Sequence, residues 1–537
     1  MKYNSRLVEK CAQGVPGEQT VLLTLKQISK ENGYSEYKAL TEHRLGMPVS
    51  AYRNADGELI ILQRDELCHA LVAGSTGCGK SMRYFENCLF NLDGKTSVIV
   101  ADVKGELYRN TASRLKEVYG NDNVKYMDFI HPTNSEILFN PIVDIARKYL
   151  EAELNPEDKQ LIRNEALSEL KVLFDKLFPI RSDKDISWDE GARGFIYGIT
   201  VGLFEDMLLT KSQEEKVKRK RVLPEQINFE AISEVFYKFN YTGNTFDDCG
   251  FFKSRNKDSI VSRYVKGIIN DAPTTRACYL QLVEGYLNDY SYPDIRNLTI
   301  TDNFDISTLG DTPKVIFLTY DITDMRMRGF VNQYIVKALD TLRKKSIDSG
   351  EPLKVPVQFF LDEFPTLQAD NIYPTIFSVG RGLNLFITAV VQDFTQLETA
   401  YKNGVAQQIR CNCNLTFFLG TNDINTAKAV KEQIGRHIIP DPANYLQGNI
   451  KFIETHLVSE DELMHRVKPG DAYITINNHM PLKGHFELYF DCPEYTQFPK
   501  VKGDKKSVID FKDPKYHYDT SWINGESKRG FTFPFDD

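Results

Sequence analysis

The stretch Gly74-Ser75-Thr76-Gly77-Cys78-Gly79-Lys80-Ser81 follows the short apolar run of residues 70–73. Its G-x-x-x-x-G-K-S spacing is that of a phosphate-binding loop, which predicts a strand before Gly74 and a helix that begins near Lys80. Glycines let consecutive N–H groups turn toward one anion, and the helix adds the positive end of its dipole. We expect all eight residues to bind nucleotide, with Lys80 on the terminal phosphates and Ser81 beside Mg²⁺. The alternative is a glycine turn that binds nothing.

A second apolar run, residues 355–361, ends in the two acids Asp362 and Glu363. Unpaired buried charges are costly, so adjacent carboxylates at the end of a buried strand indicate a cation, water or donors nearby. We expect Asp362 to hold a hydrated Mg²⁺ ion and Glu363 to polarise the water that attacks the phosphate. The alternative is an exposed acidic turn after a core strand.

Two further polar residues follow the acid pair. Arg381 stands between two glycines, and Gln392 ends the apolar run of residues 385–391. A glutamine at the end of a neighbouring strand can contact a γ-phosphate or its water, and an arginine can complete the site of an adjacent subunit. A surface arginine and a satisfied polar strand end are the alternative interpretation.

Composition limits the possible classes of protein. The chain has 537 residues, 42% of them hydrophobic, and a net charge of −8. Its overall field therefore cannot attract nucleic acid, and any such contact needs local basic surface. The nine cysteines show no paired spacing for zinc and no dense disulfide framework, which favours a reducing cytoplasm. No apolar run reaches the ~18 residues of a membrane span, and no signal peptide begins the chain.

Hydrophobic periodicity divides the chain into five parts. Strand-like and helical runs alternate after the phosphate-binding loop, which predicts a parallel sheet, whereas residues from about 147 to 297 have helical periodicity. Strand-like runs then resume at residues 314–320, 355–361, 385–391 and 415–419. We therefore expect an N-terminal extension (1–50) that leads into a hairpin with its tip at residues 54–57, a nucleotide-binding domain in two parts (51–146 and 300–500), an all-α domain (147–299) and a partly ordered C-terminal tail (501–537).

The ordered series of motifs resembles the TraG/TraD-like type IV coupling proteins, which are ring-forming ATPases of the HerA/FtsK class. Beyond the loop and the acid pair, the resemblance rests on Asp102-Val103-Lys104-Gly105-Glu106-Leu107, with valine where the family has proline, and on Phe139-Asn140-Pro141, Gly380-Arg381-Gly382, Val391-Gln392 with Gln396-Leu397, and Leu419-Gly420-Thr421-Asn422-Asp423 with Thr426-Ala427. These motifs extend over roughly residues 65–430.

The resemblance implies a RecA-like P-loop NTPase sheet interrupted by an all-α domain, assembled as a homo-hexamer with ATP and Mg²⁺ between subunits. It implies catalytic roles for Lys80, Glu363, Arg381 in trans and Gln392, and metal binding by Ser81 and Asp362. The all-α domain, with Trp188-Asp189-Glu190-Gly191-Ala192-Arg193, would meet relaxase or protein effector substrates. Further expected partners are single- or double-stranded DNA, the type IV secretion channel ATPases and a small membrane protein. The sequence lacks the N-terminal membrane anchor of most members, so it represents either a soluble branch that docks on a membrane partner or a chain from which the anchor was removed. We expect a cytoplasmic protein, peripheral at the cytoplasmic face of the membrane.

Three functions remain open on the sequence alone. The leading hypothesis is an ATP-driven coupling protein that passes relaxase-bound DNA or protein substrates to a conjugation or secretion channel. A double-stranded DNA pump for segregation and a substrate receptor with little turnover are the alternatives. The basic run of residues 216–221 is either a phosphate contact or a solvated loop.

Overall fold

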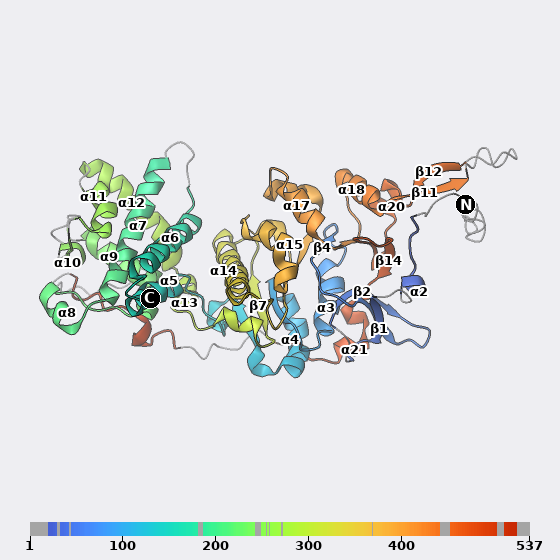
Figure 1. The fold of residues 1–537 in the computed structure, drawn as a ribbon, viewed down its shortest axis with the longest axis horizontal. Helices are drawn as coiled ribbons and strands as arrows, with labels where there is room; N and C mark the ends of the chain where they lie inside the picture. The colour runs from blue at the N-terminus through green and yellow to red at the C-terminus, as the bar shows by residue number, and fades with distance from the viewer. Residues whose placement is uncertain are drawn as a thin grey trace. The chain divides into compact units, whose positions relative to one another are not determined.

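The computed structural model describes residues 20–28, 33–41, 45–180, 186–241, 249–253, 255–256, 258–269, 272–367, 369–440, 452–501 and 510–523. The chain forms two compact units, shown in Figure 1. The first comprises Met1–Tyr126, Ile306–Thr323 and Ile335–Gly503, and the second Met127–Asp305, Asp324–Tyr334 and Asp504–Asp537.

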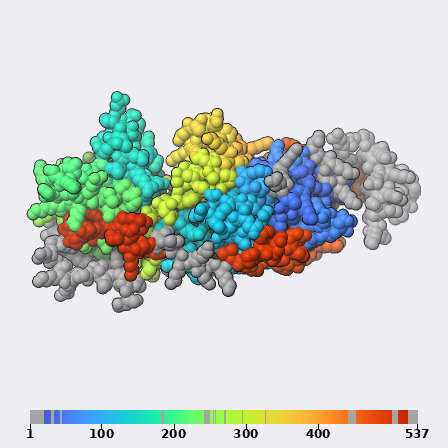
Figure 2. Space-filling model, turned by 90° about the horizontal axis from the view of Figure 1, so that it is seen from below, coloured from blue at the N-terminus to red at the C-terminus, as the bar shows by residue number. Residues whose placement is uncertain are grey.

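Among the described residues of the second unit, the long secondary-structure elements are helices. Its α-helices are α5 (Val143–Glu151), α6 (Lys159–Leu177), α7 (Ile186–Met207), α8 (Lys211–Val217), α9 (Phe229–Tyr241), α10 (Gly250–Lys253), α11 (Ile260–Ile269), α12 (Pro273–Ser291) and α13 (Pro293–Leu298). The predicted all-α character of this region is confirmed. Residues 510–523, which contain the short helix η9 (Pro514–Tyr516), also belong to this unit and are the dark red atoms beside the green helices in Figure 2.

The first unit is built on a nine-stranded sheet with the order β14-β13-β10-β4-β9-β8-β5-β7-β6. The strands are β4 (Ala70–Ala73), β5 (Ser97–Val103), β6 (Val124–Asp128), β7 (Val315–Tyr320), β8 (Val357–Leu361), β9 (Leu385–Val391), β10 (Leu415–Phe418), β13 (Asp471–Ile476) and β14 (Leu482–His485). The pairs from β10 through β4, β9, β8 and β5 to β7 are parallel, whereas β13 and β14 add antiparallel strands. The predicted α/β sheet interrupted by helices is thus confirmed.

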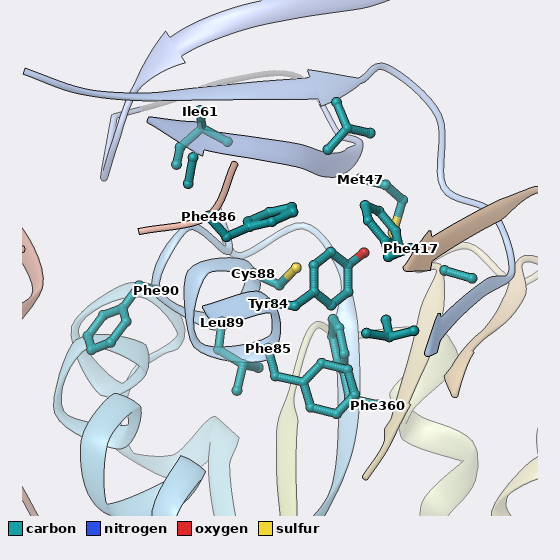
Figure 3. Packing of buried hydrophobic residues seen from close by; sticks show 14 of the residues in the cluster. Met47, Ile61, Tyr84, Phe85, Cys88, Leu89, Phe90, Phe360, Phe417 and Phe486 are labelled. Atoms are coloured by element: carbon teal, nitrogen blue, oxygen red, sulfur yellow. The ribbon is translucent and has the colours of Figure 1, made fainter. Parts of the chain in front are cut away.

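Continuous apolar runs explain the parallel strands. Every residue of β4, β7, β8 and β9 is buried, as expected where helices cover both faces of a parallel sheet. Figure 3 shows Tyr84 and Phe85, from the helix after β4, packed among Phe360, Phe417 and Phe486. The ring of Tyr84 lies 4.4 Å from that of Phe417, and Phe85 meets Phe360 edge to face at 5.0 Å. This core fixes the start of that helix against the sheet.

The remaining elements of the first unit surround this sheet. Its helices are η1 (Lys80–Phe85), α3 (Glu86–Phe90), α4 (Glu106–Tyr119), α15 (Ile372–Leu383), α16 (Phe394–Ala400), α17 (Val405–Asn412), α18 (Ile424–Ile434), α20 (Glu460–His465) and α21 (Pro493–Thr496), with the short α2 (Leu25–Ile28). The helix α14 (Met325–Ser349) contributes residues to both units. No helix among the described residues is long and apolar enough to cross a bilayer.

Two small antiparallel sheets complete the first unit. The strands β1 (Tyr34–Lys38), β3 (Leu59–Arg64) and β2 (Met47–Arg53) form one, and β11 (Arg436–Pro440) pairs with β12 (Phe452–His456) in the other. The β2–β3 hairpin turns at Asn54–Gly57, where the N–H of Gly57 donates to the carbonyl of Asn54, so the predicted hairpin is confirmed. The proposed boundary at residue 50 falls inside β2, because the hairpin makes both strands part of one sheet.

Candidate nucleotide site

The loop of residues 74–79 follows β4 at the carboxyl edge of the sheet. Gly77 and Gly79 have φ values of 83° and 87°, which side chains with a Cβ rarely adopt. The N–H of Gly74 donates to the carbonyl of Val391 at 3.2 Å, and that of Ser75 to the carbonyl of Gly420 at 2.9 Å. The loop is thereby fixed to the ends of both neighbouring strands, β9 and β10.

Lys80 begins the helix that follows the loop, as predicted. Its first turn is a π-helix in which the N–H of Glu86 donates to the carbonyl of Ser81. The Lys80 ammonium group is buried and donates to the carbonyls of Gly74 at 2.6 Å and Ser75 at 3.2 Å. These contacts hold the ammonium over the glycine-rich loop, where an anion held by the loop would meet it.

The acid pair lies at the end of β8, where the predicted metal ligands meet. The Ser81 hydroxyl donates to Oδ2 of Asp362 at 2.8 Å. Burial raises the pKa of Asp362 to about 6, although the Ser81 hydroxyl bond and the Lys80 charge act in the opposite direction. The structure therefore brings Asp362 to the adjacent residues Lys80 and Ser81, from which it lies far away in the sequence.

Glu363 turns away from the strand direction because its backbone is left-handed, with φ of 52°. Its carboxylate accepts hydrogen bonds from Nε2 of Gln392, at 3.3 Å to each oxygen. Gln392 follows β9, which lies between β4 and β8 in the sheet. The parallel arrangement thus places the glutamine between the phosphate-binding loop and the acid pair.

The loop after β10 supports the Gln392 segment. Asp423 accepts hydrogen bonds from the hydroxyls of Thr395 and Thr426, at 3.1 and 2.7 Å. The Thr426 hydroxyl in turn accepts from the N–H of Phe394 at 2.9 Å. Motifs that the sequence shows as separate are therefore one hydrogen-bonded group, which fixes the chain directly after Gln392.

Arg381 lies apart from these residues. It is exposed near the end of α15, and its guanidinium contacts Glu66 at 3.4 Å. Helix α15 ends just before β9 begins, so Arg381 stands at the amino edge of the sheet, about 20 Å from the carboxyl edge by the length of a seven-residue strand. A Cβ on Gly380 would lie 2.4 Å from the carbonyl oxygen of Leu385, so close packing, rather than freedom of the arginine, requires this glycine.

Two residues of the site escaped the sequence interpretation. Asp102, at the end of β5, accepts hydrogen bonds from the N–H groups of Leu107 and Tyr108 at 3.2 and 2.8 Å, and burial raises its pKa to about 7. Arg83 packs over Gly79 and donates to the carbonyl of Phe486 at 2.8 Å. Asp102 belongs to a motif that carried no assigned role, and nothing in the sequence links Arg83 to Phe486.

The donors present fit a nucleoside triphosphate with a hard divalent cation. The loop supplies N–H groups and an ammonium for phosphate oxygens, and a hydroxyl and a carboxylate stand 2.8 Å apart. Mg²⁺ prefers such oxygen ligands and retains several waters. The high pKa of Asp362 fits a carboxylate that lacks a cation of its own beyond Lys80.

The order of strands and the position of the loop define a P-loop NTPase fold of the RecA-like type, interrupted by an all-α unit. A family model described as "Type IV secretory system Conjugative DNA transfer" matches residues 20–510. The chain belongs to this family.

Three relatives illustrate the match. Protein VirD4 of Agrobacterium fabrum is 22% identical over 430 residues, covering 79% of this chain and 58% of VirD4. The conjugal transfer protein TraG of Escherichia coli is 22% identical over 507 residues, covering 86% and 73%. The plasmid coupling protein TrwB, solved in complex with ADP and Mg²⁺, superposes with a TM-score of 0.53 at 15% identity, covering 88% and 96%. This chain spans between 49% and 58% of the length of the VirD4 proteins that it matches.

Proposed function

We propose that this protein hydrolyses ATP to pass DNA, with its bound relaxase, or protein substrates to a type IV secretion channel. The observation that carries the proposal is the meeting of Ser81 with Asp362 and of Gln392 with Glu363 at one sheet edge, beside Lys80. Membership of the conjugative DNA transfer family and the ADP and Mg²⁺ found in TrwB support it.

Each residue of the site has a role in this proposal. The N–H groups of residues 74–81 and the Lys80 ammonium bind the phosphates, and Ser81 and Asp362 hold Mg²⁺, which neutralises charge that develops on the phosphoryl oxygens. Glu363 orients and polarises the attacking water. Gln392 holds the Glu363 carboxylate at 3.3 Å and senses the terminal phosphate.

Arg381 acts in trans in this proposal, within a homo-hexamer. Its position at the opposite edge of the sheet from its own phosphate-binding loop supports action on a neighbouring subunit. Mixing Arg381→Ala with Lys80→Ala subunits should restore some turnover, since some interfaces then combine an intact loop with an intact arginine. Arginines of this kind contribute roughly 10³ to 10⁵ in rate. Absence of recovery at every mixing ratio would contradict the trans role.

We also propose that the all-α region 147–299 receives relaxase or effector substrates. Channel ATPases and a small membrane protein bind the assembly at the cytoplasmic face of the membrane.

ATP turnover by the purified chain, with and without DNA, tests whether the protein is an ATP-driven motor. Lys80→Ala and Glu363→Gln should each remove most turnover, whereas Lys171→Ala and Glu351→Gln, at exposed positions, should not. Turnover that persists in both site variants would contradict the proposal.

A further inference from the structure

Residues 510–523, here called the strap, lie along the helical unit and are held largely through their backbone. The carbonyl of Tyr516 accepts from Nδ2 of Asn228 at 2.9 Å, and that of His517 from Nε2 of Gln226 at 3.0 Å. At the far end the N–H of Gly250 donates to the carbonyl of Ile523 at 3.0 Å. The strap thus lies against the helices of this unit, as the red atoms beside the green ones in Figure 2 show.

Residues 216–221, here called the cationic loop, comprise the last two residues of α8 and the four that follow it, and contain five basic side chains. Arg219 points inward, where it pairs with the buried Asp206 at 2.7 Å. The side chains of Lys216, Lys218, Lys220 and Arg221 are exposed. The left-handed backbone at Lys218, with φ of 54°, ends the helix and separates the inward from the outward side chains.

Most of the exposed cations have no acidic partner. Within the described part of the chain, no carboxylate lies within ion-pair distance of Lys216, Lys218 or Arg221. Lys220 differs, because it pairs with Asp519 of the strap. The Nε of Arg221 donates to the carbonyl of Met207 at 3.1 Å, and the backbone N–H of Arg221 donates to the Glu214 carboxylate at 2.5 Å. Among the described residues, Asp519 of the strap is thus the acid that pairs with an exposed side chain of the cationic loop.

A hollow of about 350 Å³ opens between the cationic loop and the strap. Lys220, Arg221 and His517 line it together with Asp519. The imidazole of His517 contacts the Glu230 carboxylate at 2.7 Å, so the two loop cations are the groups available to an anion there. The Asp519 carboxylate already shows that an oxyanion binds at Lys220.

We propose that the cationic loop binds the phosphate backbone of nucleic acid, and that Asp519 of the strap competes with that backbone for Lys220. A repeating phosphate chain suits several unpaired cations on one short loop, since each contact releases condensed counterions. The chain carries a net charge of −8, so this local surface, rather than the overall field, supplies the attraction. The inference rests on the proposed function, in which DNA passes along this protein.

Binding of a fluorescein-labelled oligothymidylate to the full chain, measured by anisotropy over a series of salt concentrations, tests the surface. The variant Lys216→Gln/Lys218→Gln/Arg221→Gln should bind at least about tenfold more weakly, and the slope of log K against log salt should fall by about 2, or about 0.7 for each lost phosphate contact. The matched control Lys171→Gln/Lys253→Gln/Arg263→Gln removes the same charge from exposed positions on the same unit and should retain the slope.

Asp519→Asn should tighten binding several-fold, because it frees Lys220 while the amide oxygen still accepts from the N–H of Ser521. Equal weakening in both triple variants, or unchanged binding in Asp519→Asn, would overturn the proposal. Polyglutamate that competes as well as unlabelled oligothymidylate of equal charge would overturn the assignment to nucleic acid. ATP turnover without DNA, measured on the same samples, should be unchanged in all three variants. Failure of the proposed function would appear instead as absence of ATP turnover in the unaltered chain.

Discussion

Two buried aspartates, one in each unit, have the same raised pKa in different surroundings. Burial raises the pKa of Asp206 in the helical unit and of Asp362 at the sheet edge to about 6. Asp206 is bound by two guanidinium groups, Arg255 at 2.6 Å and Arg219 at 2.7 Å. Asp362 receives one hydroxyl, that of Ser81.

The difference lies in the partners. The two arginines neutralise the charge of Asp206 with side chains of the protein itself, so this cluster stabilises the helical unit. Among the described residues, the donors that meet the Asp362 carboxylate are neutral, which supports its proposed role in binding a cation that comes with a ligand. A raised pKa alone therefore does not separate a structural acid from a functional one, whereas the partners do.

The largest effect is expected for Asp362→Asn. The amide cannot supply the negative charge for Mg²⁺, so ATP turnover should fall about a thousandfold, equivalent to about 4 kcal/mol in the barrier. The free energy of unfolding should stay the same or rise, because an incompletely paired buried carboxylate is removed. Steady-state kinetics and urea denaturation measure the two quantities. Loss of stability with unchanged turnover would contradict the functional role of Asp362 and indicate a structural one.

The same substitution at Asp206 should have the opposite result. Asp206→Asn leaves two buried guanidinium groups short of charge, and the helical unit should lose about 3 kcal/mol, since breaking a buried ion pair costs about 3–5 kcal/mol and Glu205 still pairs with Arg255. The two tryptophans of the chain, Trp188 and Trp522, both lie in the helical unit, so their fluorescence during denaturation reports this unit. DNA-free turnover below the transition should be unchanged. Loss of turnover without loss of stability would be incompatible with a structural role.

Acid should weaken Mg²⁺ binding through Asp362. Its pKa lies at about 6 in the folded chain and at 3.8 in the reference state, so the folded chain takes up a proton as the pH falls through 6. Asp362 therefore contributes less favourably to the free energy of folding as the pH rises from about 4 to 6. Over the same range, the affinity of the Asp362 carboxylate for Mg²⁺ increases. The Mg²⁺ concentration for half-maximal turnover should rise about fivefold from pH 6 to pH 5, because the ionised fraction of a group with a pKa of about 6 falls by that factor. A flat profile would show that another group holds the metal.

The smallest effect is expected at His517. The hydrogen bond that its imidazole donates to the Glu230 carboxylate raises the pKa of His517, so the stabilisation by the protonated imidazole is present below about 6.5 and is lost as pH rises through the folded value. Glu234 and Asp513 also face this charge. The change, under about 1 kcal/mol for a partly exposed pair, should appear as a pH-dependent shift of Trp522 fluorescence in a Trp188→Phe background. His517→Asn should abolish the shift and His456→Asn, in the other unit, should not.

Much of the fold could be predicted because its signals are local. The apolar runs that become β4, β8 and β9 are continuous, and polar residues follow each directly, so parallel strands bring Lys80, Asp362 and Gln392 to one edge. The helical unit also has clear periodicity.

Other features depend on contacts that produce no periodic pattern in the sequence. The strap is held by its carbonyls, which every sequence possesses, so residues 510–523 resemble a tail. The role of Asp102 depends on left-handed turns at Lys104 and Gly105, of which only the glycine is visible in the sequence. The strands β13 and β14 are antiparallel additions whose pairing partners lie far away in the sequence.

The strand order also has a consequence for synthesis on the ribosome. When Val103 has been made, β4 and β5 both exist, but β9 and β8 stand between them in the finished sheet, and these begin only at Leu385 and Val357. The two nascent apolar strands must therefore wait through the whole helical insertion with their hydrogen-bonding edges unpaired. Sheets with such long-range pairing fold slowly and expose apolar surface and unpaired strand edges that promote aggregation. The yield of folded protein should therefore depend strongly on chaperones and on the rate of translation.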